Sequence, residues 1–290
     1  MARLTTFRDQ AAMIEAAAER IASLVGAAIT ARGAAAVALS GGSTPQPLYE
    51  LLAREDHPWR ARIDWPRVHL FWSDERNVPP DQPGSNFDMA NRALIQHVPI
   101  EPSHLYRMRG ELPAVEAGPL YDAILSARRD QMPGSLFDVL LLGIGADAHI
   151  ASIFPESPLL MAGREGPPYM CGADLSGPRG GPDPSTSSGS SRVLSRDERL
   201  APHVEELAAG VWVPKLRHWR ITLTPPALLD ADAIIMIASG AVKAAAIAAA
   251  IEARPDVARY PAQLLREAGD RVEWIVDEAA AKDLIDRRAS

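Results

Sequence analysis

Apolar residues near the start of the chain change from the spacing of a helix to that of a strand. Between Ala11 and Thr30 they recur at the spacing of one buried helix face. The run Ala36–Ser40 then reads AVALS and stops at a glycine-rich turn. We therefore expect a helix, a buried strand and a tight loop, in that order.

Strand-like runs of apolar residues recur along the rest of the chain, with helix-like segments between them. These runs are Val68–Trp72, Asp138–Ile144, Ile221–Thr224, Ala233–Ser239 and Val272–Val276. Several are apolar at nearly every position, which is typical of parallel strands that are buried on both faces. The pattern predicts an α/β fold: a doubly wound, Rossmann-like, mostly parallel sheet with helices on both faces.

One segment interrupts this pattern. Residues 163–191 end in SGPRGGPDPSTSSGSS and are rich in Gly, Pro and Ser. Such a composition buries little apolar surface. We predict one domain over residues 1–290, with a flexible surface insertion at about 163–191; a lid over the site is the alternative for that segment.

The charge balance narrows the range of partners. The chain has 30 Lys and Arg against 37 Asp and Glu, a net charge of −7. No basic stripe stands out, so we expect a small-molecule ligand and no nucleic acid. Cys171 is the only cysteine, which excludes an intrachain disulfide and fits a reducing, cytoplasmic location.

Two segments bear on targeting. The first ten residues, MARLTTFRDQ, lack the apolar core and cleavage site of a signal peptide. The alanine-rich stretch 231–250 is interrupted by Asp232 and Lys243, which argues against a membrane span. We expect a soluble protein with no membrane attachment.

The first candidate for chemistry is the turn SGGSTP that follows the first buried strand. Gly41 and Gly42 would let the backbone approach an anion, and Ser43 and Thr44 would add hydroxyl donors at a helix start. Phosphate fits such a loop. The same residues also describe an ordinary strand-to-helix turn with a Ser or Thr cap.

The second candidate is SDERN, directly after Val68–Trp72. It places Asp74, Glu75 and Arg76 at the end of a strand, and the planar guanidinium of Arg76 could clamp a phosphate or carboxylate. The alternative is a turn that carries an ordinary surface ion pair.

The third candidate is LGIGADAH, at the end of the next buried strand. Asp147 and His149 lie two residues apart there, and a histidine beside a carboxylate suits general-base chemistry near neutral pH. A histidine that merely packs or caps a helix end is the alternative. No Cys or His cluster has metal-ligand spacing, so we expect no metal and no cofactor.

The last two candidates are single cations beside strands. Arg220 precedes the run Ile221–Thr224, and Lys243 follows Ala233–Ser239 in the first turn of a predicted helix. A helix N-terminus disfavours a cation, so an anionic ligand would help to explain Lys243. Solvated surface side chains are the alternative for both.

Taken in order, SGGSTP, FWSDERNVP with SNF, LLGIGADAHIASIFP, RITLT and GAVK resemble the successive motifs of the 6-phosphogluconolactonase family. That family lies within the larger glucosamine-6-phosphate isomerase/deaminase-like superfamily, and the resemblance runs from about Ala11 to Asp286. It implies hydrolysis of 6-phospho-D-glucono-1,5-lactone to 6-phospho-D-gluconate, the second step of the oxidative pentose phosphate pathway. It also implies a metal-free enzyme; we expect a monomer or small homo-oligomer.

The resemblance assigns roles by position. His149 would activate a water molecule as general base, with Asp147 beside it and Arg76 among the groups that hold the substrate. The substrate and its phosphate would be bound by Gly41, Gly42, Ser43, Thr44, Asp74, Arg220 and Lys243.

Two observations keep alternatives open. The family usually reads Asp-Gly-His where this chain has Ala148 between Asp147 and His149, so a sugar-phosphate sensor that has lost catalysis is one alternative. An aminosugar-phosphate deaminase/isomerase is the other. Deaminases carry an acidic residue where this chain has Phe154, which favours the lactonase.

Overall fold

The computed structural model describes residues 2–131, 134–160 and 206–285. The predicted insertion at 163–191 therefore lies outside the described residues. Within them, none of the helices is long and apolar enough to cross a membrane.

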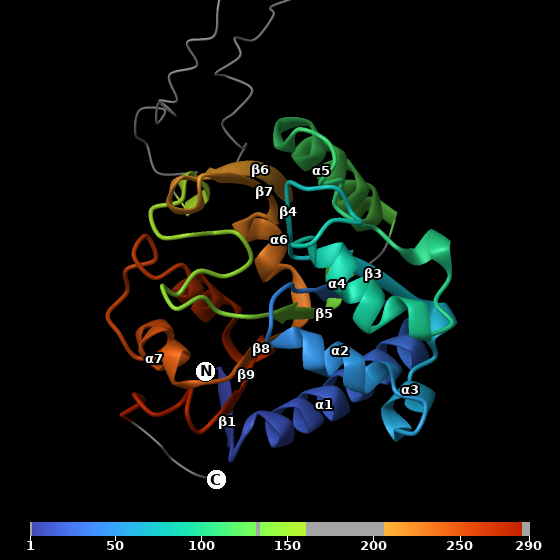
Figure 1. Cartoon of the computed structure of the whole chain (residues 1–290), viewed down its shortest axis with the longest axis horizontal. Coiled ribbons are helices and arrows are strands. Elements are labelled where there is room, and N and C mark those ends of the chain that lie inside the picture. The colour runs from blue at the N-terminus through green and yellow to red at the C-terminus, as the bar shows by residue number, and fades with distance from the viewer. Residues whose placement is uncertain (1, 132–133, 161–205, 286–290) are drawn as a thin grey trace, which may run out of the picture.

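The centre of the fold is a six-stranded sheet in which every neighbouring pair of strands is parallel (Figure 1). The strand order is β1-β9-β8-β5-β2-β3. The bounds are β1 Arg3–Phe7, β2 Ala35–Leu39, β3 Val68–Trp72, β5 Phe137–Leu142, β8 Ala231–Ala238 and β9 Val272–Asp277. The predicted doubly wound, mostly parallel sheet is confirmed. The sequence pattern missed β1, an edge strand that is largely exposed.

Helices cover both faces of this sheet because alternate residues of each strand point to opposite sides. Val37 and Leu39 of β2 pack in one core with α1 and α2, whereas Ala36 and Ala38 belong to the other core, with α5 and α7. The helices are α1 Gln10–Arg32, α2 Pro45–Ala53, α3 Pro58–Arg62, α4 Asn86–Ala93, α5 Ala114–Gln131, α6 Pro225–Leu229 and α7 Ala244–Ile251. A 3-10 segment, Pro261–Arg271, precedes β9.

The long helix α1 confirms the first sequence prediction, and its ends follow from local chemistry. The Asp9 carboxylate accepts a hydrogen bond from the Ala12 amide at 2.8 Å, which caps the first turn. Gly33 ends the helix at φ 83°, and its amide donates to the Ile29 carbonyl. The helix therefore extends slightly beyond Ala11–Thr30 at both ends.

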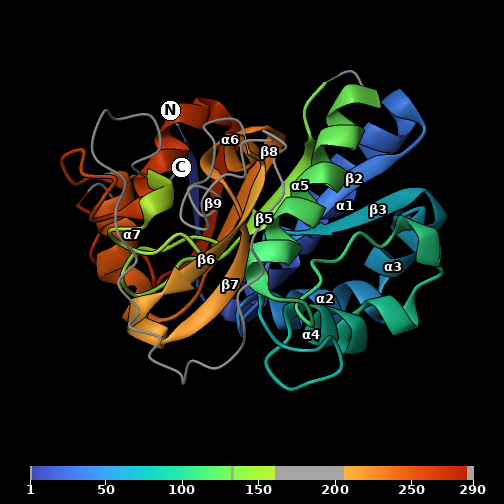
Figure 2. The ribbon, with the colours of Figure 1, turned by 90° about the horizontal axis from the view of Figure 1, so that it is seen from above.

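A second, antiparallel sheet corrects one prediction. Its order is β4-β7-β6, with bounds β4 Asp74–Arg76, β7 His218–Leu223 and β6 Ala208–Val213. The run Ile221–Thr224 was expected in the parallel sheet, but β7 pairs antiparallel with both neighbours. The SDERN segment likewise forms the short strand β4 rather than a turn. Figure 2 shows the β6–β7 hairpin beside the parallel sheet.

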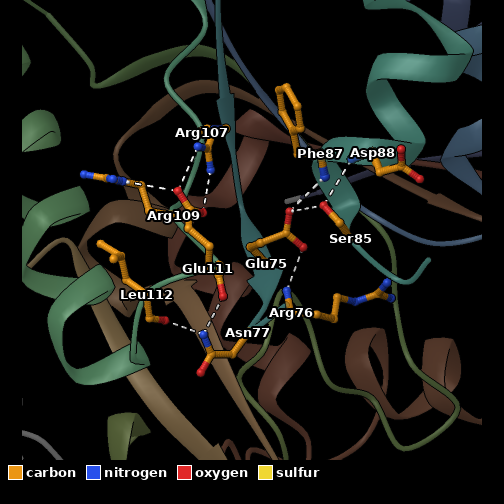
Figure 3. A network of polar contacts seen from close by, with 11 residues as sticks. Glu75, Arg76, Asn77, Ser85, Phe87, Asp88, Arg107, Arg109, Glu111 and Leu112 are labelled. Atoms are coloured by element: carbon orange, nitrogen blue, oxygen red, sulfur yellow. Dashed lines mark hydrogen bonds and ion pairs between the residues drawn. The ribbon is translucent and has the colours of Figure 1, made fainter. Parts of the chain in front are cut away.

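The carboxylate of Glu75 joins β4 to the start of α4 (Figure 3). Its side chain is buried, with the residue 2% exposed. One oxygen accepts from the amides of Arg76 and Asn86, both at 2.7 Å, and the other from the Phe87 amide at 2.8 Å and the Ser85 hydroxyl at 3.0 Å. Burial raises the pKa of Glu75, and these four donors oppose that rise.

A second set of contacts, also drawn in Figure 3, holds residues 107–112 together and joins them to Asn77, directly after β4. Arg107 holds the Glu111 carboxylate with two hydrogen bonds of 2.8 and 2.9 Å. These bonds are the largest cause that lowers the pKa of Glu111, to about 2. The side-chain amide of Asn77 donates to the backbone carbonyls of Gly110 and Leu112. β4 and the segments beside it are thus held from two sides.

Replacement of Glu75 should destabilise the fold in graded steps. Glu75→Gln places an NH2 group against the Phe87 amide, so we expect a loss of about 1–3 kcal/mol in the free energy of unfolding. Glu75→Ala leaves three buried amides unpaired and should cost more. Urea unfolding of the two variants and the wild type measures this. Losses below about 0.5 kcal/mol in both variants would contradict the structural role.

Candidate functional site

The candidate residues lie on loops that leave the carboxyl ends of β2, β3, β5 and β8, and on the second sheet beside them. Parallel strands bring these ends to one edge of a sheet, where ligands of α/β folds collect. Hydrogen bonds link several of these segments directly.

Asp147 and His149 form a hydrogen-bonded pair after β5. The Nδ1 atom of His149 lies 2.5 Å from Oδ1 of Asp147, and both side chains are partly exposed, at 30% and 23%. A carboxylate at Nδ1 favours the proton on that nitrogen and leaves Nε2 as an acceptor. The pair therefore has the arrangement of a general base with an orienting acid. This contact is compatible with a general base and with a packed histidine, so the general-base role stays a prediction.

Gly145 makes room for the pair. A Cβ atom at this position would lie 2.0 Å from Nδ1 of His149 and 2.6 Å from the Asp147 carboxylate. Any other residue would displace one of the two side chains. The Gly145 amide also donates to the His149 carbonyl at 2.9 Å, which closes the turn.

Ala148 adopts the left-handed backbone that glycine favours, with φ 63°. An L-residue in this region costs about 1–2 kcal/mol. The turn forms nevertheless: the Ala148 amide donates to Gly145, and its carbonyl accepts from Ala262, both at 3.0 Å. With alanine at this position, the contact between Asp147 and His149 is present.

Phe154 covers one face of the His149 ring. The two rings are stacked with centroids 4.1 Å apart. An uncharged aromatic ring therefore lies against the imidazole on this side, and the Asp147 carboxylate contacts its Nδ1 atom.

Asp74 is the meeting point of several loops. It is buried, and its carboxylate accepts from the Ser152 hydroxyl at 2.6 Å and from the Asn86 side-chain amide at 3.1 Å. Ser152 belongs to the loop that carries His149. The sequence patterns did not identify Asn86 or Ser152, because neither stands in a pattern that predicts contact with a distant carboxylate.

The SGGSTP loop lies against Asn86. A Cβ on Gly41 would fall 1.8 Å from the Asn86 side-chain oxygen, so only glycine fits. Gly42 has φ 106°, which also favours glycine. Thr44 occupies the N-cap position of α2 but makes no capping hydrogen bond through its side chain. The exposed Ser43 and the partly exposed Thr44 thus keep their hydroxyls for another partner.

Arg76 and Arg220 lie directly opposite each other on β4 and β7. Like charges at such a position are unfavourable without a counter-ion. Arg76 donates to the Gly84 carbonyl, and Arg220 to the Trp219 carbonyl. Burial is the first cause that lowers the pKa of Arg220; the Asp74 charge opposes it, and the charge of Arg76 adds to it. Arg220 was expected beside the start of a parallel strand; it lies within an antiparallel strand instead.

Lys243 ends a 3-10 turn just before α7, close to its predicted place. Its side chain is partly buried; burial lowers the lysine's pKa, and the Asp147 charge opposes that effect. The loop before it is held by Asp277, which accepts from the Gly240 amide at 3.0 Å and from the Ser239 hydroxyl. Asp277 is a positioning residue that the sequence patterns missed.

Over the described ranges, no three His, Cys, Asp or Glu side chains gather in a way that could hold a metal ion. The candidate residues instead comprise a histidine–carboxylate pair, two arginines, a lysine and a glycine-rich loop. Such a set suits an anionic substrate that reacts with water.

Comparison with known proteins places the chain in a family. A family model described as glucosamine-6-phosphate isomerases/6-phosphogluconolactonase matches residues 8–178 and 195–274. The chain is 33% identical to a 6-phosphogluconolactonase of Mycobacterium leprae, covering 97% of both chains. It is 31% identical to one of Nostoc, covering 95% of both.

Solved structures agree on the fold. A 6-phosphogluconolactonase from Trypanosoma brucei matches with a TM-score of 0.71 at 22% identity, over 98% of this chain and 99% of that one. A monomeric glucosamine-6-phosphate deaminase matches with a TM-score of 0.70 at 18% identity, over 97% and 99%. The fold is therefore common to proteins of both activities. The family model and the curated relatives match most of the chain by sequence. The chain belongs to the glucosamine-6-phosphate isomerase/6-phosphogluconolactonase family.

Proposed function

We propose that this protein hydrolyses 6-phospho-D-glucono-1,5-lactone to 6-phospho-D-gluconate, in the oxidative pentose phosphate pathway. The observation that carries the proposal is the hydrogen bond from His149 to Asp147 beside a cluster of cations. The relatives of matching length bear the name of this activity.

The proposed reaction needs only a base and an electrophilic carbonyl. Nε2 of His149 takes a proton from water as the oxygen attacks the lactone carbonyl, and Asp147 stabilises the imidazolium that forms. The tetrahedral oxyanion then collapses, the bond to the ring oxygen breaks, and the imidazolium returns the proton to that oxygen. Water is thereby added across the ester bond, with no net change at His149.

Binding is assigned to the groups around this pair. Arg76, Arg220, Lys243 and the loop residues Gly41, Gly42, Ser43 and Thr44 are proposed to hold the phosphate. Arg76 and Arg220 face each other, and a phosphate dianion beside them would reduce their mutual repulsion, which supports this assignment. Both oxygens of Asp74 accept hydrogen bonds from protein groups, so we assign Asp74 to the substrate site chiefly as the residue that orders it.

A deaminase is less well supported. The ring of Phe154 stacks on His149 where a deaminase-like sequence has a carboxylate. A single-domain organisation, a cytoplasmic location and a monomeric or small homo-oligomeric state stay predictions.

Loss of the base should abolish most of the activity. His149→Asn removes the proton acceptor, so we expect turnover to fall by roughly 100-fold or more, since general-base assistance contributes about 10²–10⁴-fold. The lactone is generated with glucose-6-phosphate dehydrogenase, and hydrolysis is measured above the spontaneous rate. An unchanged circular dichroism spectrum controls for folding. A variant that keeps a third or more of the wild-type rate would refute the role of His149.

Phosphate recognition should depend on the three cations. Arg76→Ala, Arg220→Ala and Lys243→Ala should each weaken binding of 6-phosphogluconate more than binding of gluconate, because charge-assisted bonds to the dianion are lost. Calorimetry at fixed salt gives the ratio of the two dissociation constants. Arg129→Ala, an exposed arginine in the last turn of α5, is the control. If all three variants keep the wild-type ratio, the phosphate lies elsewhere.

Ala148→Gly distinguishes an enzyme from a sensor that has lost catalysis. Because His149 already contacts Asp147, relief of the left-handed strain should change turnover by less than about threefold. Stability should also change little, since the buried methyl group that is lost contributes about 0.8 kcal/mol in the opposite direction. A wild type without turnover that gains it in Ala148→Gly would show that Ala148 had disabled the site.

A further inference from the structure

A lysine from the second sheet shares the carboxylate of Asp147 with His149. The side chain of Lys215 donates to Oδ2 of Asp147 at 2.7 Å, while Oδ1 faces the imidazole. Lys215 stands in the turn Pro214–Leu216 between β6 and β7, whereas Asp147 follows β5. The ion pair therefore connects the hairpin to the candidate base.

The hairpin holds this lysine in a defined place. Trp212 and Trp219 are cross-strand partners in edge-to-face contact, with ring centroids 5.7 Å apart. The turn closes with a hydrogen bond from the Arg217 amide to the Pro214 carbonyl at 3.1 Å. An exposed ion pair by itself contributes little to stability. The location of Lys215 matters because its partner is the residue that orients His149.

We propose that Lys215 is a positioning residue that sets the pH range in which His149 works as a base. The inference rests on the proposed function. A cation on Oδ2 offsets part of the negative charge that Asp147 presents to the histidine, and so weakens the stabilisation that the carboxylate gives to an imidazolium.

The charges around the pair have opposite effects. Asp147 favours the imidazolium, and Lys215 from the β6–β7 turn disfavours it. Lys243 from the loop before α7 also interacts electrostatically with Asp147 and adds to the effect of Lys215. Phe154 contributes an uncharged ring face. Of the two lysines, Lys215 is the one that makes a direct hydrogen bond to the carboxylate.

The test is the pH dependence of kcat/KM for lactone hydrolysis between pH 5 and 7.5 at fixed ionic strength. In Lys215→Met the acid limb should move to higher pH by about 0.3–0.8 unit, because one nearby positive charge is gone. Lys215→Arg should restore the wild-type position. Arg217→Gln removes a charge from the same turn and is the matched control; its limb should not move.

The outcomes separate this inference from the proposed function. An acid limb that stays in place in Lys215→Met, or one that moves equally in Arg217→Gln, overturns the role of Lys215. A limb that persists unchanged in His149→Asn contradicts the proposed base itself. A lysine that only stabilised the hairpin would lower Tm in Lys215→Met without moving the limb, which also overturns the inference.

Discussion

The buried carboxylate of Asp74 is the contact on which the geometry of the site depends. Through Ser152 it holds the loop that carries His149, and through Asn86 it supports the glycine loop at Gly41. Its own strand, β4, aligns Arg76 with Arg220. A buried carboxylate is tolerated where hydrogen bonds replace water, and here the donors come from the loop after β5 and from the start of α4. Burial of this one carboxylate therefore requires both segments to be in place.

Two other acidic side chains also hold backbone segments in place. Glu75 accepts from one backbone amide in β4 and from two amides and a hydroxyl at the start of α4. Asp277 fixes the turn that leads to Lys243. Asp147 instead presents its oxygens to two side chains at a partly exposed surface, one to His149 and one to Lys215. These bonds, with that of His149 the largest cause, hold the pKa of Asp147 well below its usual range, so it remains ionised and able to orient the imidazole.

Sequence patterns predicted the features that depend on residues close together in the chain. Mostly apolar runs predicted five of the six strands of the parallel sheet, and Asp147 and His149 lie close enough in sequence to suggest their contact. The run Ile221–Thr224 misled, since a short apolar run does not reveal its partner strand. The motif around Glu75 also fitted an ordinary surface ion pair, and Lys215 lay outside every motif of the sequence that pointed to chemistry. Both depend on contacts between segments distant in sequence, which periodicity does not encode.

The central claim is that Asp147 fixes the proton on Nδ1 of His149 and leaves Nε2 bare to accept one from water. Two-bond proton–nitrogen correlation in protein labelled with 15N-histidine reports the tautomer of each neutral ring, and His149→Asn identifies the signal. Near pH 8 we expect the proton on Nδ1, and a changed tautomer balance in Asp147→Asn. A proton on Nε2 of His149 in the wild-type protein would contradict the account.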